Sequence, residues 1–469
     1  MPRIPWPAWS RVQCVGTSYL LPLGLALVCT ACVRGPVDPV GPPSVVLFVA
    51  DDQGLFMGAY GQSSVTTPHL DRLASEGLRF DGAYAVTAVC TPSRAALYTG
   101  RFPAGNGCDG FGPIREGVSI WGDLLGPAGY RTGLIGKLGG KPLERFKFDF
   151  FARNLPAHPG ARSVDWYVEQ LEAFLSVDDP RPFCLVVNLR DAHYPFPTDG
   201  APTGRSEGPE PPHDPARVTL PGFLPDLPAV RQEFARFHDS LRRLDVTVGL
   251  MLEVLDERVP AEELLVVHTT DHGIPFPFAK TTLYEAGIRV SLVARWPGTI
   301  AAGGATPALT SLADLLPTLL ELAGAPVPEA MDGRSLARVL RGETDEHHAA
   351  VFGSHTHHRQ EPMVPSRSIR VGDWKYIRNY RPDAVFKNAV MMTSASWGAI
   401  KAEAQTDSDL AQRVANLERR PPEELFNLAD DPWELTNLAG KPEASSELED
   451  LRRQLDAFLE RQADPLLDG

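Results

Sequence analysis

The sequence predicts an α/β protein in which a large, mostly parallel sheet is covered by helices on both faces. Short, almost continuously apolar strands alternate with helical segments from residue 44 to about residue 346. Strands of this kind are typical of parallel sheets that are buried on both faces. Of the 469 residues, 43% are hydrophobic and 22% are charged, which allows a large core and excludes a globally disordered chain.

The elements follow one another in the order that such a fold requires. Five apolar runs are expected to form strands, at residues 44–49, 131–135, 183–189, 262–270 and 288–296. Helices are expected at 68–76, between Pro68 and Gly77, and near 312–322. The longest helix is expected at 229–257, where apolar residues recur every three or four positions and form a stripe that packs against the sheet.

Two regions depart from this alternation. Segment 195–228 holds ten prolines and is expected to be an irregular surface loop or pocket wall rather than regular structure. From about residue 347 the strand-like runs become shorter, at 349–354, 368–371 and 375–377, and a charged helix is expected at 446–461. We therefore predict a main domain at 44–346 and a smaller C-terminal α+β subdomain at 347–469.

The N-terminal segment predicts export. Residues 1–31 carry two arginines, no acidic residue and an apolar run at about 20–29 that is too short to span a membrane, as in a secretory signal. Residues 27–32 also resemble a bacterial lipobox in which Cys32 would carry the lipid, and the Pro- and Gly-rich segment 32–43 would be a tether. We expect a protein of the bacterial periplasm or cell surface, bound to the membrane by a lipid anchor at Cys32. A soluble exported protein and an uncleaved anchor are the alternatives.

The net charge limits the classes of partner, and the cysteine count limits disulfide pairing. The formal net charge of −14 argues against nucleic acid as a partner, but an anionic substrate can still bind in a local basic pocket. After cleavage before Cys32, the other cysteines are Cys90, Cys108 and Cys184, so at least one of them is unpaired within the chain. Cys184 lies in a predicted strand and is expected to be an inert core thiol. Cys108 lies in a glycine-rich loop and has no clear role.

Acidic residues follow two of the predicted strands. Asp51 and Asp52 come after the first strand, and Asp271 and His272 come after the strand at 262–270. Ligands of parallel sheets bind at the carboxyl ends of the strands. Three carboxylates and one further ligand suit a hard divalent cation such as Ca²⁺, Mg²⁺ or Mn²⁺, while the imidazole leaves Mn²⁺ or Zn²⁺ open. By spacing alone, a solvated pair of aspartates is the alternative.

A second motif carries a family resemblance. It reads Cys90-Thr91-Pro92-Ser93-Arg94 and is followed by Leu97-Tyr98-Thr99-Gly100. This run resembles the signature of the formylglycine-dependent sulfatases, a family of the alkaline phosphatase superfamily. Further motifs of that family recur in order over about 44–440, at 49–52, 67–71, 133–137, 220–226, 244–245, 270–273 and 424–428. The resemblance implies the sulfatase fold and a maturation enzyme that oxidises Cys90 to formylglycine, whose hydrated aldehyde is the nucleophile.

A closer likeness bears on the substrate. Residues 273–277 with 281–284, and residues 351–354 with His357 and His358, are similar to the heparan N-sulfatase (sulfamidase) branch. That branch implies a sulfated carbohydrate, with N-sulfated glucosamine as the first candidate. His357 and His358 would then line a glycan subsite, although exposed loop histidines are an equal alternative.

The resemblance also assigns roles at the site. One divalent cation, Ca²⁺ in the first place and Mn²⁺ or Mg²⁺ as alternatives, would be held by Asp51, Asp52, Asp271, His272 and the modified Cys90. The cationic groups of Arg94, Lys137 and Lys280 would neutralise the sulfate oxygens. His193, which follows the strand at 183–189, or Lys280 would give a proton to the leaving group.

Two departures from the family keep other functions open. His272 stands where the family usually has asparagine, which suggests a phosphodiesterase or phosphonate monoester hydrolase of the same superfamily as an alternative. Gly139 stands where the family has a histidine that contacts the formylglycine diol, two positions after Lys137. Lys141 or His272 could replace that histidine. Without a replacement, the chain could be a lipoprotein that binds sulfated glycans without turning them over.

Overall fold

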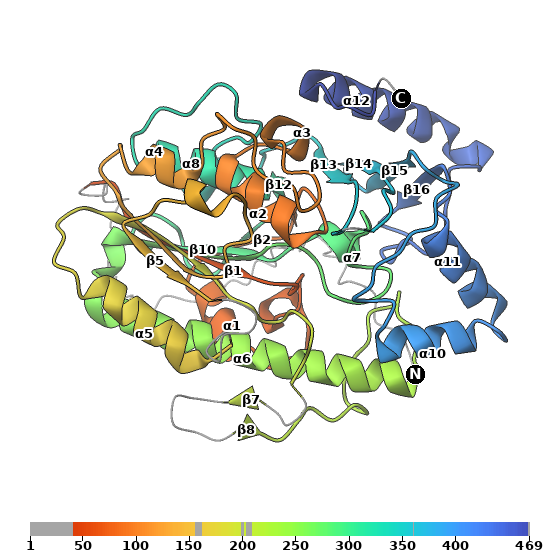
Figure 1. Ribbon diagram of the computed structural model, residues 1–469, viewed down its shortest axis with the longest axis horizontal. Coiled ribbons are helices and arrows are strands. Elements are labelled where there is room, and N and C mark those ends of the chain that lie inside the picture. The colour runs from red at the N-terminus through yellow and green to blue at the C-terminus, as the bar shows by residue number, and fades with distance from the viewer. Residues whose placement is uncertain (1–40, 155–161, 198–200, 203–208, 360, 468–469) are drawn as a thin grey trace, which may run out of the picture.

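The computed structural model describes residues 41–154, 162–197, 201–202, 209–359 and 361–467 (Figure 1). The predicted signal at 1–31, the lipidation site Cys32 and most of the tether lie outside these residues. Among the helices of the described residues, none combines the length and the apolar character needed to cross a membrane.

An eight-stranded sheet forms the centre of the molecule, in the order β11-β2-β10-β9-β1-β6-β4-β5. Its strands are β1 (Ser44–Ala50), β2 (Leu78–Phe80), β4 (Arg131–Gly136), β5 (Phe150–Arg153), β6 (Phe183–Asn188), β9 (Leu264–Thr270), β10 (Leu292–Arg295) and β11 (Gly304–Thr306). All neighbours pair in parallel except β10, which runs antiparallel to both β9 and β2. The predicted mostly parallel sheet is therefore confirmed, and the strand expected at 288–296 is shorter and antiparallel.

Helices cover both faces of this sheet, as expected (Figure 1). Alternate residues of β1 enter two different cores: Val46 and Phe48 enter one, and Val45 and Leu47 enter the other. The first core contains residues of α1 (Pro68–Ser75), α5 (Val164–Leu175) and α6 (Pro228–Arg258). The second contains residues of α2 (Cys90–Thr99), α4 (Trp121–Leu125) and α8 (Leu315–Leu322), which follows the 3-10 turn η4 (Leu312–Asp314).

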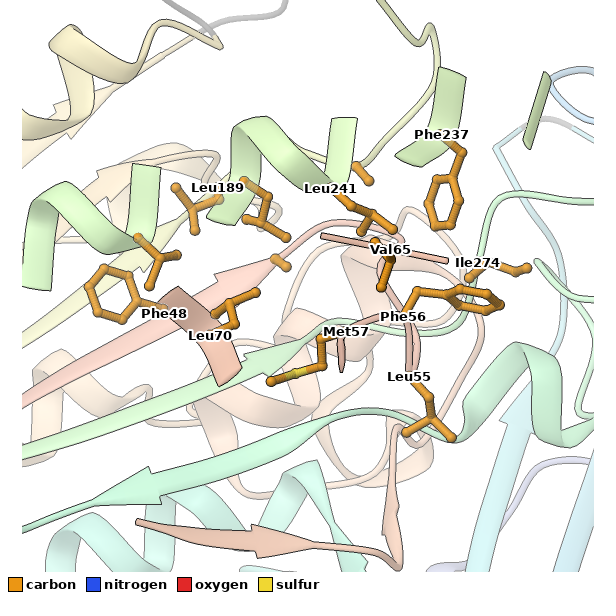
Figure 2. Close-up of a cluster of buried hydrophobic side chains, with 14 of the residues drawn as sticks. Phe48, Leu55, Phe56, Met57, Val65, Leu70, Leu189, Phe237, Leu241 and Ile274 are labelled. Carbon is orange, nitrogen blue, oxygen red and sulfur yellow. The ribbon is translucent and has the colours of Figure 1, made fainter. Parts of the chain in front are cut away.

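The apolar stripe of α6 packs on the sheet as its spacing predicts. Figure 2 shows Phe237 and Leu241 of α6 facing a layer that includes Phe48 of β1 and Leu70 of α1. All four side chains are fully buried. Each contributes about 1.5–3 kcal/mol through its removal from water. This packing fixes α6 against one face of the sheet.

The proline-rich segment is irregular except for one short pair of strands. β7 (Ala201–Pro202) and β8 (Pro209–Glu210) pair antiparallel. The expectation that 195–228 contains no regular structure is wrong at this point. A two-residue pair outside the main sheet leaves few ladder hydrogen bonds for proline to disrupt, so prolines are tolerated there.

A second, four-stranded antiparallel sheet lies in the C-terminal part. It consists of β13 (Val351–His355), β14 (Ser366–Val371), β15 (Trp374–Asn379) and β16 (Glu423–Asn427), and α12 (Ser445–Gln462) covers it. This confirms the smaller α+β unit and its final helix. Sequence reasoning missed β16, α10 (Ala395–Glu403) and α11 (Ser408–Glu418). The two helices bury Trp397, Ile400 and Leu410 in the core of the main sheet, so the C-terminal part shares that core. The domain boundary at 346/347 therefore stays a prediction.

The remaining elements are short connections. They are β3 (Ala83–Tyr84), β12 (Thr310–Ser311), α3 (Pro103–Asn106), α7 (Glu285–Ile288), α9 (Ala337–Leu340), η1 (Gly58–Tyr60), η2 (Leu143–Arg145), η3 (Ala261–Glu263) and η5 (Pro442–Ala444).

A buried carboxyl group links α6 to α1 and predicts a pH-dependent stability. Asp245 accepts the N–H groups of Leu70 at 2.8 Å and His69 at 3.3 Å, and burial raises its pKa to about 7. Between about pH 4 and 7 the folded state therefore binds more protons than the unfolded state, and the free energy of unfolding falls as pH rises. Asp245→Asn should remove up to about 4 kcal/mol of this decrease. Urea unfolding at pH 5 and pH 8 tests it, and an equal pH dependence in both proteins would contradict it.

Candidate active site

The carboxyl ends of three neighbouring strands bring the predicted site residues together. Ala50 of β1 pairs with Thr270 of β9, and Val49 pairs with Asn188 of β6, so the residues that follow these strands emerge at one edge. The residues so placed are Asp51 and Asp52 after β1, His193 after β6, and Asp271 and His272 after β9. α2 begins beside them with Cys90 as its first residue.

Each of the two aspartates that follow β1 forms an ion pair with a different lysine. The Nζ of Lys137 lies 2.5 Å from Oδ2 of Asp51. The Nζ of Lys280 lies 2.7 and 2.6 Å from the two carboxylate oxygens of Asp52. Burial opposes ionisation of both carboxyls, but the neighbouring lysines outweigh burial and lower the pKa of each. The pair of adjacent carboxylates is thus ionised and neutralised from two sides.

Arg94 is fully buried beneath these carboxylates. Its Nε and Nη2 both lie 3.0 Å from Oδ2 of Asp271, and its Nη2 donates to the carbonyl of Ala50 at 3.2 Å. Its Nη1 donates to the side-chain oxygen of Asn188, whose Nδ2 donates to the hydroxyl of Tyr98 at 2.9 Å. Sequence reasoning missed Asn188 and Tyr98. A polar residue at the end of the apolar strand β6 was the available signal.

Cys90 lies beside His272 and retains 6% of its exposed surface. The Nδ1 of His272 lies 3.0 Å from the carbonyl of Gly273, which assigns the proton to Nδ1 and leaves the Nε2 lone pair for the site. Burial alone would raise the pKa of the Cys90 thiol. The charge of Lys137 and the neighbouring His272 ring overcome this effect and lower the pKa.

The donor set fits one divalent cation. Ligand atoms of Asp51, Cys90, Asp271 and His272 all lie within 4.8 Å of one another. Oδ1 of Asp51 and Nε2 of His272 are buried without a hydrogen-bond partner, an arrangement that is costly unless another group satisfies them. Asp52, the remaining predicted ligand, has both oxygens on Lys280, although its Oδ1 lies 3.1 Å from His272 Nε2.

His193 is placed at the open side of the site and is 23% exposed. Its Nε2 lies 3.9 Å from Oδ2 of Asp52, and its Nδ1 lies 2.5 Å from the carbonyl of Tyr194, which again leaves Nε2 as an acceptor. Burial and the charge of Lys280 lower the pKa of His193 to about 4, so the ring is neutral near pH 7. Arg162 donates to the His193 carbonyl at 2.7 Å and holds this loop.

The two histidines suggested for a glycan subsite are not exposed loop residues. His358 is buried and stands edge-on to Phe111, with 5.2 Å between ring centroids. Burial and the charge of Lys280 lower its pKa to about 3, so its ring is neutral near pH 7. His357 is half-buried and packs against Gly110. A contact with substrate stays a prediction for both.

Gly139 has a structural reason to lack a side chain. Its φ is +63°, a left-handed conformation, and a Cβ added there would collide with the Cδ of Arg94. The hydroxyl of Tyr98 donates to the carbonyl of Leu138 at 2.8 Å and fixes this turn. Of the two groups that could replace the missing histidine, Lys141 is exposed, whereas His272 is buried beside Cys90.

Restoring the histidine of the family should therefore impair the protein. Gly139→His is expected to lower kcat/KM by about 100-fold, because displacement of Arg94 by about 1 Å misplaces its charge. Gly117→Ala is the matched control: its φ is +82° and no atom lies within 4 Å of an added Cβ. It should cost about 1 kcal/mol of stability and leave kcat/KM unchanged. An increase in turnover for Gly139→His would contradict this account.

Comparison with known proteins identifies this arrangement. Residues 43–325 match the family model Sulfatase, which covers more than half of the chain. The chain belongs to the sulfatase family. Residues 271–388 of this sulfatase also match the model described as N-sulphoglucosamine sulphohydrolase, C-terminal. The resemblance to the sulfamidase branch is thereby confirmed, and the chain is a sulfuric ester or sulfamate hydrolase.

Curated relatives share this assignment, and solved structures share the fold. The sulfatase is 31% identical to human N-sulphoglucosamine sulphohydrolase, over 88% of this chain and 89% of the relative. It is 28% identical to an ulvan-active sulfatase of Formosa agariphila, over 91% and 82%. A protein solved with its substrate D-glucosamine-2-N,6-O-disulfate matches the fold with a TM-score of 0.68 at 20% identity, over 90% and 99%. The phosphonate monoester hydrolase of Agrobacterium radiobacter matches it with 0.69 at 19%, over 90% and 96%.

Proposed function

We propose that this sulfatase is an exported enzyme that removes sulfate from sulfated carbohydrate through a formylglycine made from Cys90. N-sulfated glucosamine is the first substrate candidate, because the chain is similar to human N-sulphoglucosamine sulphohydrolase and matches the C-terminal family model of that name. The observation that carries the proposal is the set of three cationic groups around Cys90: Arg94 and Lys280 are buried, and Lys137 is partly buried. An anionic sulfate needs such groups before a nucleophile can approach its sulfur.

The cation that we propose is Ca²⁺, with Mn²⁺ or Mg²⁺ as alternatives, because hard divalent cations prefer oxygen ligands and the site holds three carboxylates. Asp51, Asp271, His272 and the modified Cys90 would hold it, with Asp52 beside them. When bound, the cation would polarise a sulfate oxygen as a Lewis acid. Lys137 and Lys280, whose partners keep both amines protonated, would bind the other sulfate oxygens.

The residues of the site divide the proton transfers between them. One hydroxyl of the hydrated aldehyde at position 90 releases its proton to solvent and attacks sulfur, and the bond from sulfur to the sugar oxygen or nitrogen breaks. Lys280 is favoured as the donor to this leaving atom, because it carries its proton at rest whereas His193 is neutral. The second hydroxyl then loses its proton, which His193 Nε2 can accept. The C–O bond to sulfate breaks and the aldehyde is regenerated for hydration by water.

A leaving-group series distinguishes these two roles. Lys280→Gln is expected to slow hydrolysis of a sugar sulfate by about 100-fold or more, and to slow that of nitrophenyl sulfate far less, since a good leaving group needs no proton. His193→Gln should slow both substrates to the same degree. The measurement is kcat/KM over aryl sulfates of increasing leaving-group pKa. Equal slopes for wild type and Lys280→Gln would assign the proton to another group.

Substrate class is tested on the matured protein. Release of sulfate is measured from N-sulfated and 6-O-sulfated glucosamine, beside a matched aryl sulfate, aryl phosphodiester and phosphonate monoester. We expect the sulfated sugars to be cleaved fastest. Faster cleavage of the phosphorus esters would favour the phosphonate hydrolase alternative, which His272 motivates. Binding of sulfated glycan without product would favour the binding lipoprotein.

Export and anchoring belong to the same proposal. Residues 27–32 support lipidation of Cys32. The first strand of the sheet, β1, begins at Ser44, so a short segment would link the lipid anchor to the fold. Membrane fractionation of the full chain and of Cys32→Ala tests this. The wild type should sediment with membranes and the variant should be soluble. An equal distribution of the two would rule out the lipid anchor.

A further inference from the structure

A cluster of one aspartate and two histidines lies apart from the catalytic centre, at the start of α8. We propose that Asp314, His347 and His348 form a second metal site, suited to a borderline cation such as Zn²⁺. Among the residues that the structure describes, their ligand atoms form one of the groups that lie within 4.8 Å of one another. The group shares no residue with the cluster around Cys90.

The distances in this cluster are close to those of a tetrahedral site. Nε2 of His348 lies 2.9 Å from Oδ2 and 3.0 Å from Oδ1 of Asp314, and Nε2 of His347 lies 3.2 Å from Oδ2. The two imidazole rings are 4.3 Å apart between centroids. A tetrahedron with metal–ligand bonds of about 2.0–2.1 Å has edges of about 3.3 Å, so small side-chain shifts are enough to admit an ion.

Backbone groups hold the carboxylate in place without the histidines. Asp314 is fully buried and accepts the N–H of Ser311 at 2.8 Å and the N–H of Arg334 at 2.8 Å. The histidine segment is fixed as well, because Arg334 Nη1 donates to the His347 carbonyl at 3.2 Å and the His348 N–H donates to the Leu309 carbonyl at 3.2 Å. Ligands that are oriented by such partners lose little entropy when a metal binds.

The donor atoms of this cluster favour Zn²⁺ over Ca²⁺, the cation that we propose for the catalytic centre. Two imidazole nitrogens and one carboxylate oxygen are a common set for Zn²⁺, whereas Ca²⁺ takes oxygen ligands. A cavity of about 370 Å³ borders the cluster and is lined by Asp314, His348, Asp332, Phe352 and Phe458 among others. His348 is 18% exposed, so an ion and a water as fourth ligand can enter from this cavity.

The test uses the full-length protein, stripped of metal by a chelator and then saturated with Ca²⁺. Zinc chloride is titrated calorimetrically into wild type and into the double variant His347→Gln/His348→Gln. The matched control is His213→Gln, which removes a histidine that lies 2.7 Å from a different buried carboxylate, Asp239. Wild type and His213→Gln should bind one more zinc per chain than the double variant. Co²⁺ should give a tetrahedral visible spectrum that only the double variant lacks.

Thermal stability and the zinc affinity of single variants test the same site independently. Zinc should raise the Tm of wild type by several degrees and leave that of the double variant unchanged. Each single variant should weaken zinc binding by about 10- to 100-fold. The double variant should keep its sulfatase activity with Ca²⁺, which shows that it folds. Equal zinc stoichiometry and affinity in wild type and double variant would overturn the proposal, as would the absence of zinc binding to wild type under these conditions. Asp314 would then only cap its helix turn.

Discussion

The Cys90→Ala variant is expected to lose sulfate hydrolysis by about 1,000-fold or more while keeping its fold. Cys90 is the first residue of α2, and its thiol lies among Lys137, Lys280 and His272 at the centre of the site. Removal of its sulfur deletes the atom that maturation would replace with the nucleophile. The measurement is sulfate release at saturating substrate, together with Tm.

A second thiol provides the control for this loss. Cys184 is fully buried in β6 and has no polar role, so burial raises its pKa to about 12. Cys184→Ala should lower the stability by about 1 kcal/mol through lost packing and leave kcat within about twofold. If Cys90→Ala retains activity, position 90 does not carry the nucleophile.

The Arg94→Lys variant is expected to show the second-largest effect, a fall in kcat/KM of about 100- to 10,000-fold. The guanidinium group contacts Asp271, Asn188 and the carbonyl of Ala50 at the same time. A lysine keeps the charge but cannot make these three contacts, so the substitution isolates geometry from charge. Steady-state kinetics on a sugar sulfate measure the loss.

A second buried arginine serves as the control that distinguishes an effect on catalysis from an effect on stability. Arg295 is also buried and binds two carboxylates, Glu76 at 2.9 Å and Asp256 at 2.7 Å. Arg295→Lys should lower Tm to a similar degree as Arg94→Lys and leave kcat/KM unchanged. Equal kinetic losses in the two variants would mean that Arg94 acts through stability alone.

The apolar strand runs were sufficient to predict most of the central sheet. β1, β4, β6 and β9 appear within two residues of their expected ends. The antiparallel direction of β10 was not predictable, because an apolar run looks alike in either direction. The helices α10 and α11 were missed because each is short and has few apolar residues, which pack against the core of the main sheet.

The candidate site was predicted in its residues but not in its connections. The motif around Cys90 and the polar residues after β1 and β9 identified the groups that meet. Which lysine neutralises which aspartate depends on contacts across 86 and 228 residues of sequence, and no local pattern encodes these. The reason for Gly139 also stayed hidden, because a positive φ and the closeness of Arg94 are properties of the folded chain.

If Cys90 becomes the nucleophile, the mass of the peptide that contains it must change. The protein is isolated from its native host, digested and analysed by mass spectrometry. We expect an aldehyde in place of the thiol, with one sulfur and two hydrogens replaced by one oxygen. An unmodified thiol in protein that nevertheless hydrolyses sulfated sugars would contradict it.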